Sequence, residues 1–173
     1  MSKTTFHIIF MFIILALLQV VVFNRICLFG VAVPFVFIYL FIKLPVNLNL
    51  KWVFTIGFLM GLIVDVFSNT QGMNALACTI LCALRLPTLR LYFPREEEMV
   101  YPVPSSRTLG SGVFMKYVLT MTLCYCALFF VIESFTFFNP LRLVVKTIAS
   151  TALTFLVIIA IDSLTSRSRE KRL

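Results

Sequence analysis

The sequence predicts an all-α membrane protein, with about six transmembrane helices in a single domain over residues 1–173. Three observations lead to this prediction. The composition is 61% hydrophobic and the mean hydropathy is +1.03, both well above the values of soluble domains. The chain contains six apolar runs, joined by connections that are too short for a separate soluble domain. A transmembrane helix needs about 20 apolar residues, so a chain of 173 residues has room for about six.

The first apolar run covers residues 5–23 and is not followed by a small-residue cleavage site, so we expect a retained helix rather than a signal peptide. The second run covers residues 26–42 and contains Pro34, which removes an amide donor and predicts a bend in the helix. The third run, residues 52–67, is short, so neither of these two needs to cross as a straight rod. The remaining helices are expected over residues 73–92, 113–135 and 141–161.

Residues 93–112 form the longest connection, and their prolines and glycines predict a linker rather than a folded unit. Residues 163–173 are predicted to be a short basic tail that suits contact with lipid. Six helices place both termini on the same side of the membrane. The distribution of basic residues predicts that this side is the cytoplasm. Of the 15 lysines and arginines, only three lie on the opposite side, and these are Arg25, Arg142 and Lys146.

The formal net charge of +8 needs no nucleic-acid partner, because basic residues beside a membrane meet anionic lipid. Enzyme chemistry finds little support, since the sequence contains a single histidine and no pairing of an acid with a base. No metal or other cofactor is expected. The five cysteines lie mostly within apolar runs and lack metal-binding spacing, so we expect them to be small buried hydrophobic residues.

Gly57, Gly61 and Asp65 recur at intervals of four residues and therefore lie along one stripe of the third helix. Two glycines at this spacing allow a neighbouring helix backbone to approach closely. Two interpretations stay open. The stripe, with Gly72 and Asn74 in the turn and helix that follow, packs inside the bundle or binds a helix of another protein.

An ionised carboxylate at membrane depth costs about 2.5 to 3.5 kcal/mol on insertion scales, so we expect Asp65 to have a compensating partner. Its own helix gives no compensation, because Asp65 lies near the negative end of that helix dipole. We expect Lys146 as the first partner, because it lies at similar depth in the sixth helix, with Glu133 as a competitor for Lys146. The other candidates are Arg25, Arg142 and the amides of Asn69 and Asn74.

Two segments resemble a known family. The first segment, residues 57–76, reads GFLMGLIVDVFSNTQGMNAL. It contains two glycines and an Asp, followed by a short polar turn, a further glycine and a helix of small residues. The segment ALLQVVVFNRICLFGVAVPFVFIYL, residues 16–40, has Gln19 at the end of the first run and Pro34 in the second. On these segments, together with its size and basic ends, the chain resembles the MreD family of rod-shape-determining membrane proteins. The resemblance covers about the first half of the chain, and beyond residue 93 it rests on hydropathy alone.

The resemblance implies a non-catalytic scaffold of the cell-elongation complex in the bacterial inner membrane. It implies association with a bitopic MreC-like protein and, through the complex, with MreB filaments, RodA and a class B penicillin-binding protein. It also implies a compact helical fold related to the substrate-binding component of energy-coupling-factor transporters.

That relation supplies the alternative hypothesis of a small-solute-binding membrane component, in which several polar groups converge on a ligand. Those groups would come from Asp65, Asn69, Gln71, Asn74, Glu133 and Lys146. The oligomeric state stays open, a homo-oligomer included.

Overall fold

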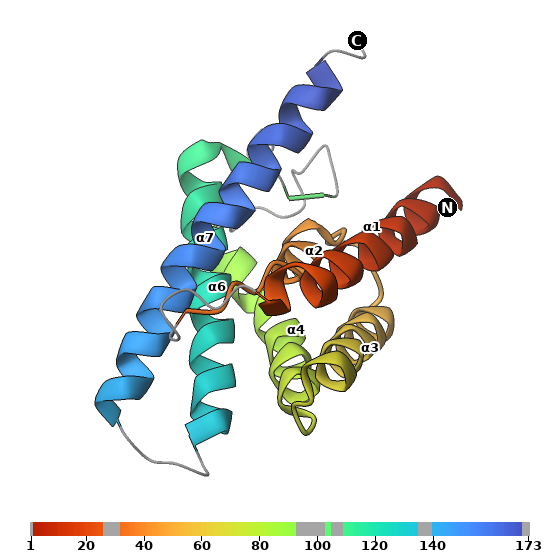
Figure 1. Cartoon of the computed structure of the whole chain (residues 1–173). Helices are drawn as coiled ribbons and strands as arrows, with labels where there is room; N and C mark the ends of the chain where they lie inside the picture. Colours follow the sequence, from red (N-terminus) through yellow and green to blue (C-terminus); the bar gives the residue numbers. More distant parts are fainter. Residues whose placement is uncertain (1, 26–31, 93–102, 105–108, 135–139, 171–173) are drawn as a thin grey trace.

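The computed structural model describes residues 2–25, 32–92, 103–104, 109–134 and 140–170 (Figure 1). It confirms the predicted fold class, an all-α polytopic membrane protein. Five helices are long and apolar enough to cross a membrane. In chain order the elements are α1 (Ser2–Val21), the short 3-10 helix η1 (Phe23–Arg25), α2 (Ile38–Lys43), α3 (Leu50–Ser68), α4 (Met73–Tyr92), α6 (Ser111–Ser134) and α7 (Pro140–Glu170).

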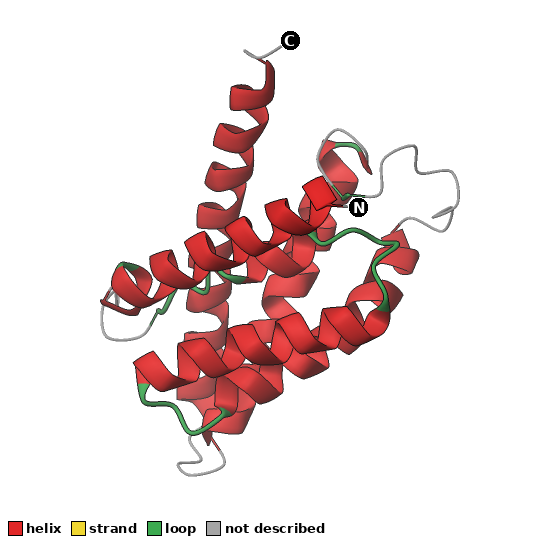
Figure 2. Cartoon of the chain, turned by 90° about the vertical axis from the view of Figure 1, so that its right-hand side faces the viewer, coloured by secondary structure: helices red, strands yellow, loops and turns green. Residues whose placement is uncertain are grey.

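The long helices α3, α4, α6 and α7 pack in chain order, each against the next (Figure 1). Figure 2 shows the same helices after a turn of 90° about the vertical axis. Helices α4 and α6 therefore lie between α3 and α7. Helix α1 packs on α3, and α2 is held among α1, α4 and α6. The centre of the bundle is aromatic, and its rings contact one another at centroid distances of 5.0 to 6.5 Å. These rings belong to Phe35, Phe37, Phe41, Tyr125, Phe129 and Phe130.

The ends of the helices are joined by polar contacts that define two ends of the bundle. At one end the Asn24 side chain donates a hydrogen bond to Ser68 Oγ at 2.8 Å. At the other end Lys43 Nζ lies 2.6 Å from the Asp162 carboxylate. We call residues 32–43, which lie inside the bundle and end with α2 at this second end, the broken crossing.

The prediction of a helix over residues 26–42 is wrong for residues 32–37 and correct for residues 38–42. Residues 32–37 are not helical, and helix begins only at Ile38. Proline explains the difference, because Pro34 has no N–H to donate and its ring disfavours the helical conformation of Val33. Residues 26–31 lie outside the described residues. Pro34 therefore marks a break in this crossing rather than a bend in a continuous helix.

The broken crossing keeps its backbone amides hydrogen-bonded although it lies inside the bundle. The amide of Val33 donates to Ser150 Oγ at 3.0 Å, and the amide of Phe35 donates to Thr154 Oγ1 at 3.1 Å. The amide of Val36 donates to the Gln19 side chain at 2.8 Å. Irregular backbone is tolerated at membrane depth only where it is buried in protein or lines a cavity. Side chains of α1 and α7 satisfy that requirement here.

The last helix is longer than predicted. We expected it to end at residue 161, with a basic tail over residues 163–173, but α7 continues to Glu170. Residues 163–170 contain no proline or glycine, so nothing in the sequence stops the helix there. Helix α3 is continuous over 19 residues and needs no bend. Most of the predicted linker at residues 93–112 lies outside the described residues, and α6 begins within it at Ser111.

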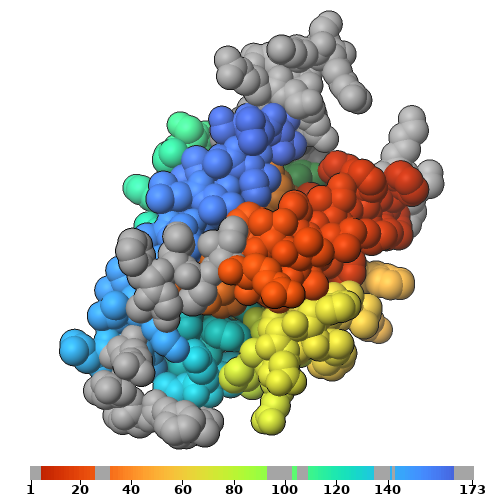
Figure 3. All heavy atoms as spheres, viewed as in Figure 1, coloured from red at the N-terminus to blue at the C-terminus, as the bar shows by residue number. Residues whose placement is uncertain are grey.

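The surface of the bundle is the reverse of a soluble protein's surface. Large apolar side chains are exposed on the outer faces of the long helices, among them Phe10 and Leu17 on α1, Val66 on α3 and Ile148 on α7. Figure 3 shows α1 uncovered along one face of the molecule. Several polar and charged side chains, by contrast, are buried inside the bundle, among them Gln19, Asp65, Asn74, Arg85 and Asp162. This distribution is expected when lipid is the solvent.

Candidate functional site

The Asp65 carboxylate, near the end of α3, is buried and accepts four hydrogen bonds. Its Oδ1 atom accepts from Thr70 Oγ1 at 2.5 Å, from the backbone N–H of Asn74 at 3.0 Å and from the side-chain Nδ2 of Asn74 at 2.9 Å. Its Oδ2 atom accepts the backbone N–H of Ala75 at 2.8 Å. Both oxygens of the carboxylate are therefore bound by residues that follow it in the chain.

These donors show what compensates the charge of Asp65. Helix α4 begins at Met73, so the amides of Asn74 and Ala75 belong to its first turn and have no partner within the helix. The carboxylate accepts both, as the side chain of an N-cap residue does, although it comes from the preceding helix. The positive end of the α4 dipole also faces the negative charge. The unfavourable dipole of α3 is thus offset by the favourable dipole of α4.

The turn between α3 and α4 has the geometry that this arrangement requires. Asn69 adopts the left-handed conformation with φ of 54°, and its backbone N–H donates to the Asp65 carbonyl oxygen. This conformation ends α3. Gly72 has a φ of 79°, a value that glycine adopts without the steric cost of a side chain. Gly72 lies before the first residue of α4, so its role is in the turn and not on a helix-packing face.

Asn74 extends the network to a third helix. The buried Tyr125 hydroxyl on α6 donates to Asn74 Oδ1 at 2.5 Å, and Asn74 Nδ2 also contacts Thr70 Oγ1 at 2.9 Å. The Asn74 side chain therefore bridges the carboxylate of α3 and the hydroxyl of α6. The network of Asp65, Thr70, Asn74 and Tyr125 holds α3, α4 and α6 together at one end of the bundle.

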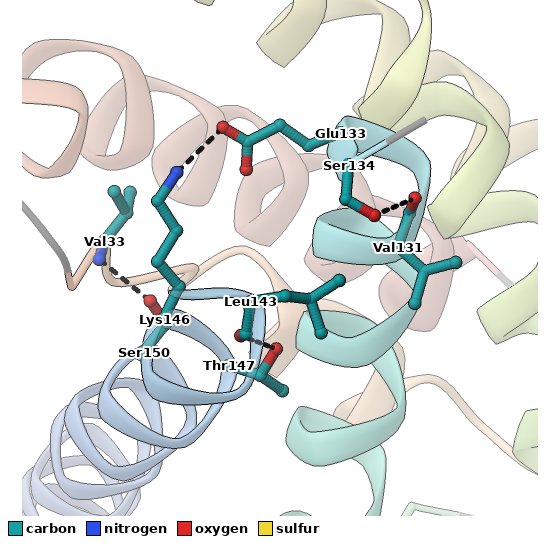
Figure 4. A network of polar contacts seen from close by, with 8 residues as sticks. All are labelled: Val33, Val131, Glu133, Ser134, Leu143, Lys146, Thr147 and Ser150. Atoms are coloured by element: carbon teal, nitrogen blue, oxygen red, sulfur yellow. Dashed lines mark hydrogen bonds and ion pairs between the residues drawn. The ribbon is translucent and has the colours of Figure 1, made fainter. Parts of the chain in front are cut away.

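The prediction that Lys146 is the partner of Asp65 is wrong. Lys146 instead pairs with Glu133 (Figure 4), and its Nζ atom lies 3.0 Å from Glu133 Oε1. The same Nζ atom lies 5.7 Å from the centroid of the Phe130 ring. The reason is the packing order, because α4 and α6 separate α3 from α7. Glu133, named as the competitor, is on the helix that adjoins α7. Of the two side-chain amides named as candidate partners, that of Asn74 binds Asp65.

Of the two remaining basic candidates, Arg25 forms no contact with Asp65 within the described residues. Arg25 ends η1, and its side chain is exposed. The side chain of Arg142 lies outside the described residues. The ion pair of Lys146 and Glu133 is partly exposed, with relative side-chain exposures of 27% and 39%, so it stabilises the contact between α6 and α7 only modestly.

The glycine stripe of α3 is occupied by α4. A Cβ atom on Gly61 would lie 2.4 Å from Ala75 Cα. Because this is a backbone atom, it could make room only if helix α4 itself shifted. A Cβ atom on Gly57 would lie 2.4 Å from Cys82 Sγ, the end of a side chain. Gly57, Gly61 and Asp65 are all buried. Of the two interpretations that the sequence left open, the structure places this stripe inside the bundle.

A second polar cluster, at the opposite end of the bundle, was not predicted. Arg85 on α4 is buried, donates from Nε to the Phe41 carbonyl oxygen at 2.8 Å, and donates from Nη2 to the Leu44 carbonyl oxygen. These carbonyls lie in the last turn and at the cap of α2, where a helix has no amide donors left for them. A cation is favoured at this end of a helix. An arginine within an apolar run was the signal available in the sequence.

The same end holds the ion pair of Lys43 and Asp162. Tyr39 donates its hydroxyl to Asp162 Oδ1 at 3.1 Å, and Lys43 Nζ lies 4.9 Å from the centroid of the Phe114 ring. This pair joins α2 to α7. Asp162 was overlooked because the sixth helix was predicted to end one residue before it.

Gln19 forms the third polar contact that the sequence reasoning had not assigned. The side chain is fully buried. Its Nε2 atom donates to the Pro34 carbonyl oxygen at 3.0 Å and to Asn24 Oδ1 at 3.2 Å, while its Oε1 atom accepts from Val36. Gln19 thus fixes the broken crossing to α1.

The cysteines that the structure describes are free thiols. Cys78, Cys82 and Cys126 are buried and Cys124 is partly buried, while Cys27 lies outside the described residues. Cys82 Sγ contacts the Val53 carbonyl oxygen at 3.4 Å. Within the described residues, no group of three or more His, Cys, Asp or Glu side chains is placed to hold a metal ion.

Comparisons with protein-family models, with curated proteins and with solved structures found no match to this chain.

Proposed function

We propose that the chain is a non-catalytic membrane scaffold, in which the intramembrane polar groups hold the helices to one another. The observation that carries this proposal is the Asp65 network, where Thr70, Asn74 and Ala75 occupy both oxygens of the carboxylate. Of the six side chains proposed for a solute site, four already bind one another. Asp65 binds Asn74, and Glu133 binds Lys146.

The resemblance to the MreD family gives the scaffold a specific place. We propose that it acts in the bacterial cell-elongation complex, where it links an MreC-like bitopic protein and the peptidoglycan-synthesis enzymes to MreB. The chain would lie in the inner membrane with both termini in the cytoplasm, as the distribution of basic residues favours. Supporting this proposal are the two sequence segments named above and the rigid helical bundle with an apolar outer surface.

The second candidate is a small-solute-binding component of a transporter. One observation favours it, because a broken helix at membrane depth is a common feature of transporter binding sites. Against it, the amides of Val33, Phe35 and Val36 already bind Ser150, Thr154 and Gln19. A solute would have to displace these side chains to reach the backbone.

One experiment separates the two candidates. The tagged chain is purified from crosslinked native membranes, and the product is analysed for proteins and for retained small molecules. The scaffold proposal expects a single-span protein to be recovered in a fixed ratio, together with loss of rod shape when the chain is depleted from cells. Recovery of a small molecule without a protein partner, from cells of unchanged shape, would favour the transporter component.

A further inference from the structure

Helix α7 holds the broken crossing through two hydroxyl groups. Ser150 Oγ accepts the backbone N–H of Val33 at 3.0 Å, and Thr154 Oγ1 accepts that of Phe35 at 3.1 Å. The two spacings match, because residues four apart on a helix are separated by about 6 Å along its axis, and residues two apart in a non-helical chain by at most about 7 Å. We call Ser150 and Thr154 the engaged pair.

The sequence of α7 contains one other pair of hydroxyl residues with the same spacing, Thr147 and Thr151. They precede the engaged pair by three residues, and both side chains are buried. The Thr147 hydroxyl donates to the Leu143 carbonyl oxygen of its own helix, as Figure 4 shows. We call Thr147 and Thr151 the spare pair.

The Thr151 hydroxyl is an exception among the helical threonines. It is buried, and within the described part of the chain it has no hydrogen-bond partner. A threonine inside a helix can donate to the carbonyl oxygen of the residue four positions before it. Seven other threonines do so here, namely Thr55, Thr79, Thr88, Thr120, Thr122, Thr147 and Thr165. A buried hydroxyl without a partner is unfavourable, so a position of α7 that pairs Thr151 would gain stability from that contact.

Two ion pairs fix the present position of α7 along its axis. Lys146 binds Glu133 of α6, and further along the helix Asp162 binds Lys43 of α2. Lys146 lies four residues before the engaged pair and Asp162 lies eight residues after it, so these contacts follow one ridge of the helix. A movement of α7 along its axis would therefore break both ion pairs together with both contacts of the engaged pair.

We propose that α7 has two registers against the broken crossing and passes between them by a screw motion of three residues. In the second register the spare pair replaces the engaged pair, so Thr147 accepts the amide of Val33 and Thr151 accepts that of Phe35. The helix moves about 4.5 Å along its axis and turns by about 60°. The movement is toward the end of the bundle that contains Lys43, which we call the Lys43 end; the opposite end is the Asp65 end. This motion is a property of the fold and does not depend on the scaffold function.

Other shifts of α7 do not keep both amides of the broken crossing paired. A shift of three residues in the opposite direction sets Leu153 and Val157 against them, and neither side chain accepts a hydrogen bond. A shift of four residues sets Lys146 or Ile158 against one of the two amides, with the same result. Non-helical backbone inside a membrane protein needs such acceptors. The second register is therefore selected by the positions of the hydroxyl groups.

The two registers differ in what they stabilise. The present register keeps both ion pairs and leaves Thr151 without a partner. The second register pairs Thr151 and separates both ion pairs. In the unaltered chain the second register should therefore be the minor state, at about 10% of the molecules or less.

The test measures distances between two spin labels on the full chain in lipid nanodiscs. The labels are attached to a ketone-bearing unnatural amino acid at exposed positions, so the native cysteines stay unmodified. One label pair joins Val66, at the Asp65 end of α3, to Leu164 of α7, and the slide should lengthen this distance by up to about 4.5 Å. The other joins Met115, at the Lys43 end of α6, to Val144 of α7, and the slide should shorten it. The distance between Val66 and Met115 does not involve α7 and should stay constant.

Removing the ion pairs should populate the second register. The ion-pair-free variant combines Lys43→Met, Asp162→Asn, Glu133→Gln and Lys146→Met. In this variant we expect a second population above about 10%, in which one distance is longer and the other is shorter. If the fourfold variant is not inserted, Lys43→Met with Asp162→Asn alone should raise the second population in the same direction.

The hydroxyl pairs are then exchanged in the ion-pair-free variant. Adding Ser150→Ala and Thr154→Val should make the second register the major one, because only the spare pair still offers two acceptors. Adding Thr147→Val and Thr151→Val instead should remove the second population. Thr165→Val is the matched control, because the Thr165 hydroxyl binds within its own helix, and it should leave both populations unchanged.

Three results would overturn the two-register motion. The first is one unchanged distance for each label pair in every variant, which would mean that Thr151 is satisfied in place, for example by a buried water molecule. The second is a change of the same sign in both label pairs, which would indicate a loosened or tilted bundle rather than a slide. The third is a second population that persists after Thr147→Val and Thr151→Val, because the spare pair would then not guide the motion.

Discussion

The Oδ2 atom of Asp65, in the last turn of α3, accepts the backbone N–H of Ala75, in the first turn of α4, at 2.8 Å. The contact closes a loop of ten residues and binds the end of one membrane helix to the start of the next. A carboxylate that a bilayer would otherwise disfavour thereby stabilises the α3–α4 hairpin.

Removing the charge of Asp65 should destabilise the hairpin. Asp65→Asn keeps the size of the side chain but replaces one acceptor oxygen by a donor, which faces the amide of Ala75 or of Asn74. We expect a loss of about 1.5 to 3 kcal/mol, the range for hydrogen bonds to charged groups. Thermal unfolding in detergent measures the loss. An unchanged melting temperature would show that the carboxylate does not cap α4.

The two glycines of α3 should differ in their sensitivity to a methyl group. Gly61→Ala meets the backbone of Ala75 and should cost about 1 to 3 kcal/mol, while Gly57→Ala meets the movable Cys82 side chain and should cost less. Gly112→Ala is the matched control, because a Cβ atom there has no neighbour within 4 Å. Its stability should stay unchanged or rise by up to about 1 kcal/mol, because alanine favours a helix more than glycine does. Equal effects at all three positions would contradict the described packing of α3 on α4.

The ion pair of Lys43 and Asp162 should be more costly to break than to replace. Its side chains are only 13% and 10% exposed, so Asp162→Asn leaves a poorly solvated cation and should cost about 2 to 4 kcal/mol. The double variant Lys43→Met with Asp162→Asn should recover most of that loss, because no charge is then left unpaired. Thermal unfolding of both single variants and the double variant decides the matter. Additive losses would mean that the two residues do not interact.

The broken crossing should depend on two hydroxyl groups of α7. Ser150→Ala and Thr154→Val each leave a buried amide without an acceptor, which costs about 1 to 3 kcal/mol. Hydrogen exchange of a peptide that covers residues 32–37 should become faster in both variants. Thr147→Ala is the control, because the Thr147 hydroxyl binds Leu143 within its own helix. Exchange that is equally slow in all variants would count against these contacts.

The sequence predicted the helical class well because long apolar runs give a strong signal in a membrane protein. It also showed that Asp65 must be compensated, since the cost of a buried charge follows from chemistry alone. The partner was wrong because the order in which helices pack is a tertiary property. Lys146 matched Asp65 in depth, but α6 lies beside α7 and offers Glu133.

The other errors come from the same source. Pro34 predicted a disturbance in the second crossing, but not that Ser150 and Thr154, more than 100 residues away, would hold its amides. Arg85 was counted as a basic residue near the membrane surface, whereas the carbonyls at the end of α2 draw it into the interior. Such contacts join segments that are far apart in the chain, and local patterns do not contain them.

Two double-mutant cycles test whether the charge of Asp65 is bound within the α3–α4 hairpin. The first combines Asp65→Asn with Asn74→Ala, and the second combines Asp65→Asn with Lys146→Met, each followed by thermal unfolding in detergent. We expect a coupling of about 1 kcal/mol or more in the first cycle and additivity within about 0.5 kcal/mol in the second. Coupling in the second cycle with additivity in the first would contradict this expectation, because Asp65 would then be paired with α7 and not with α4.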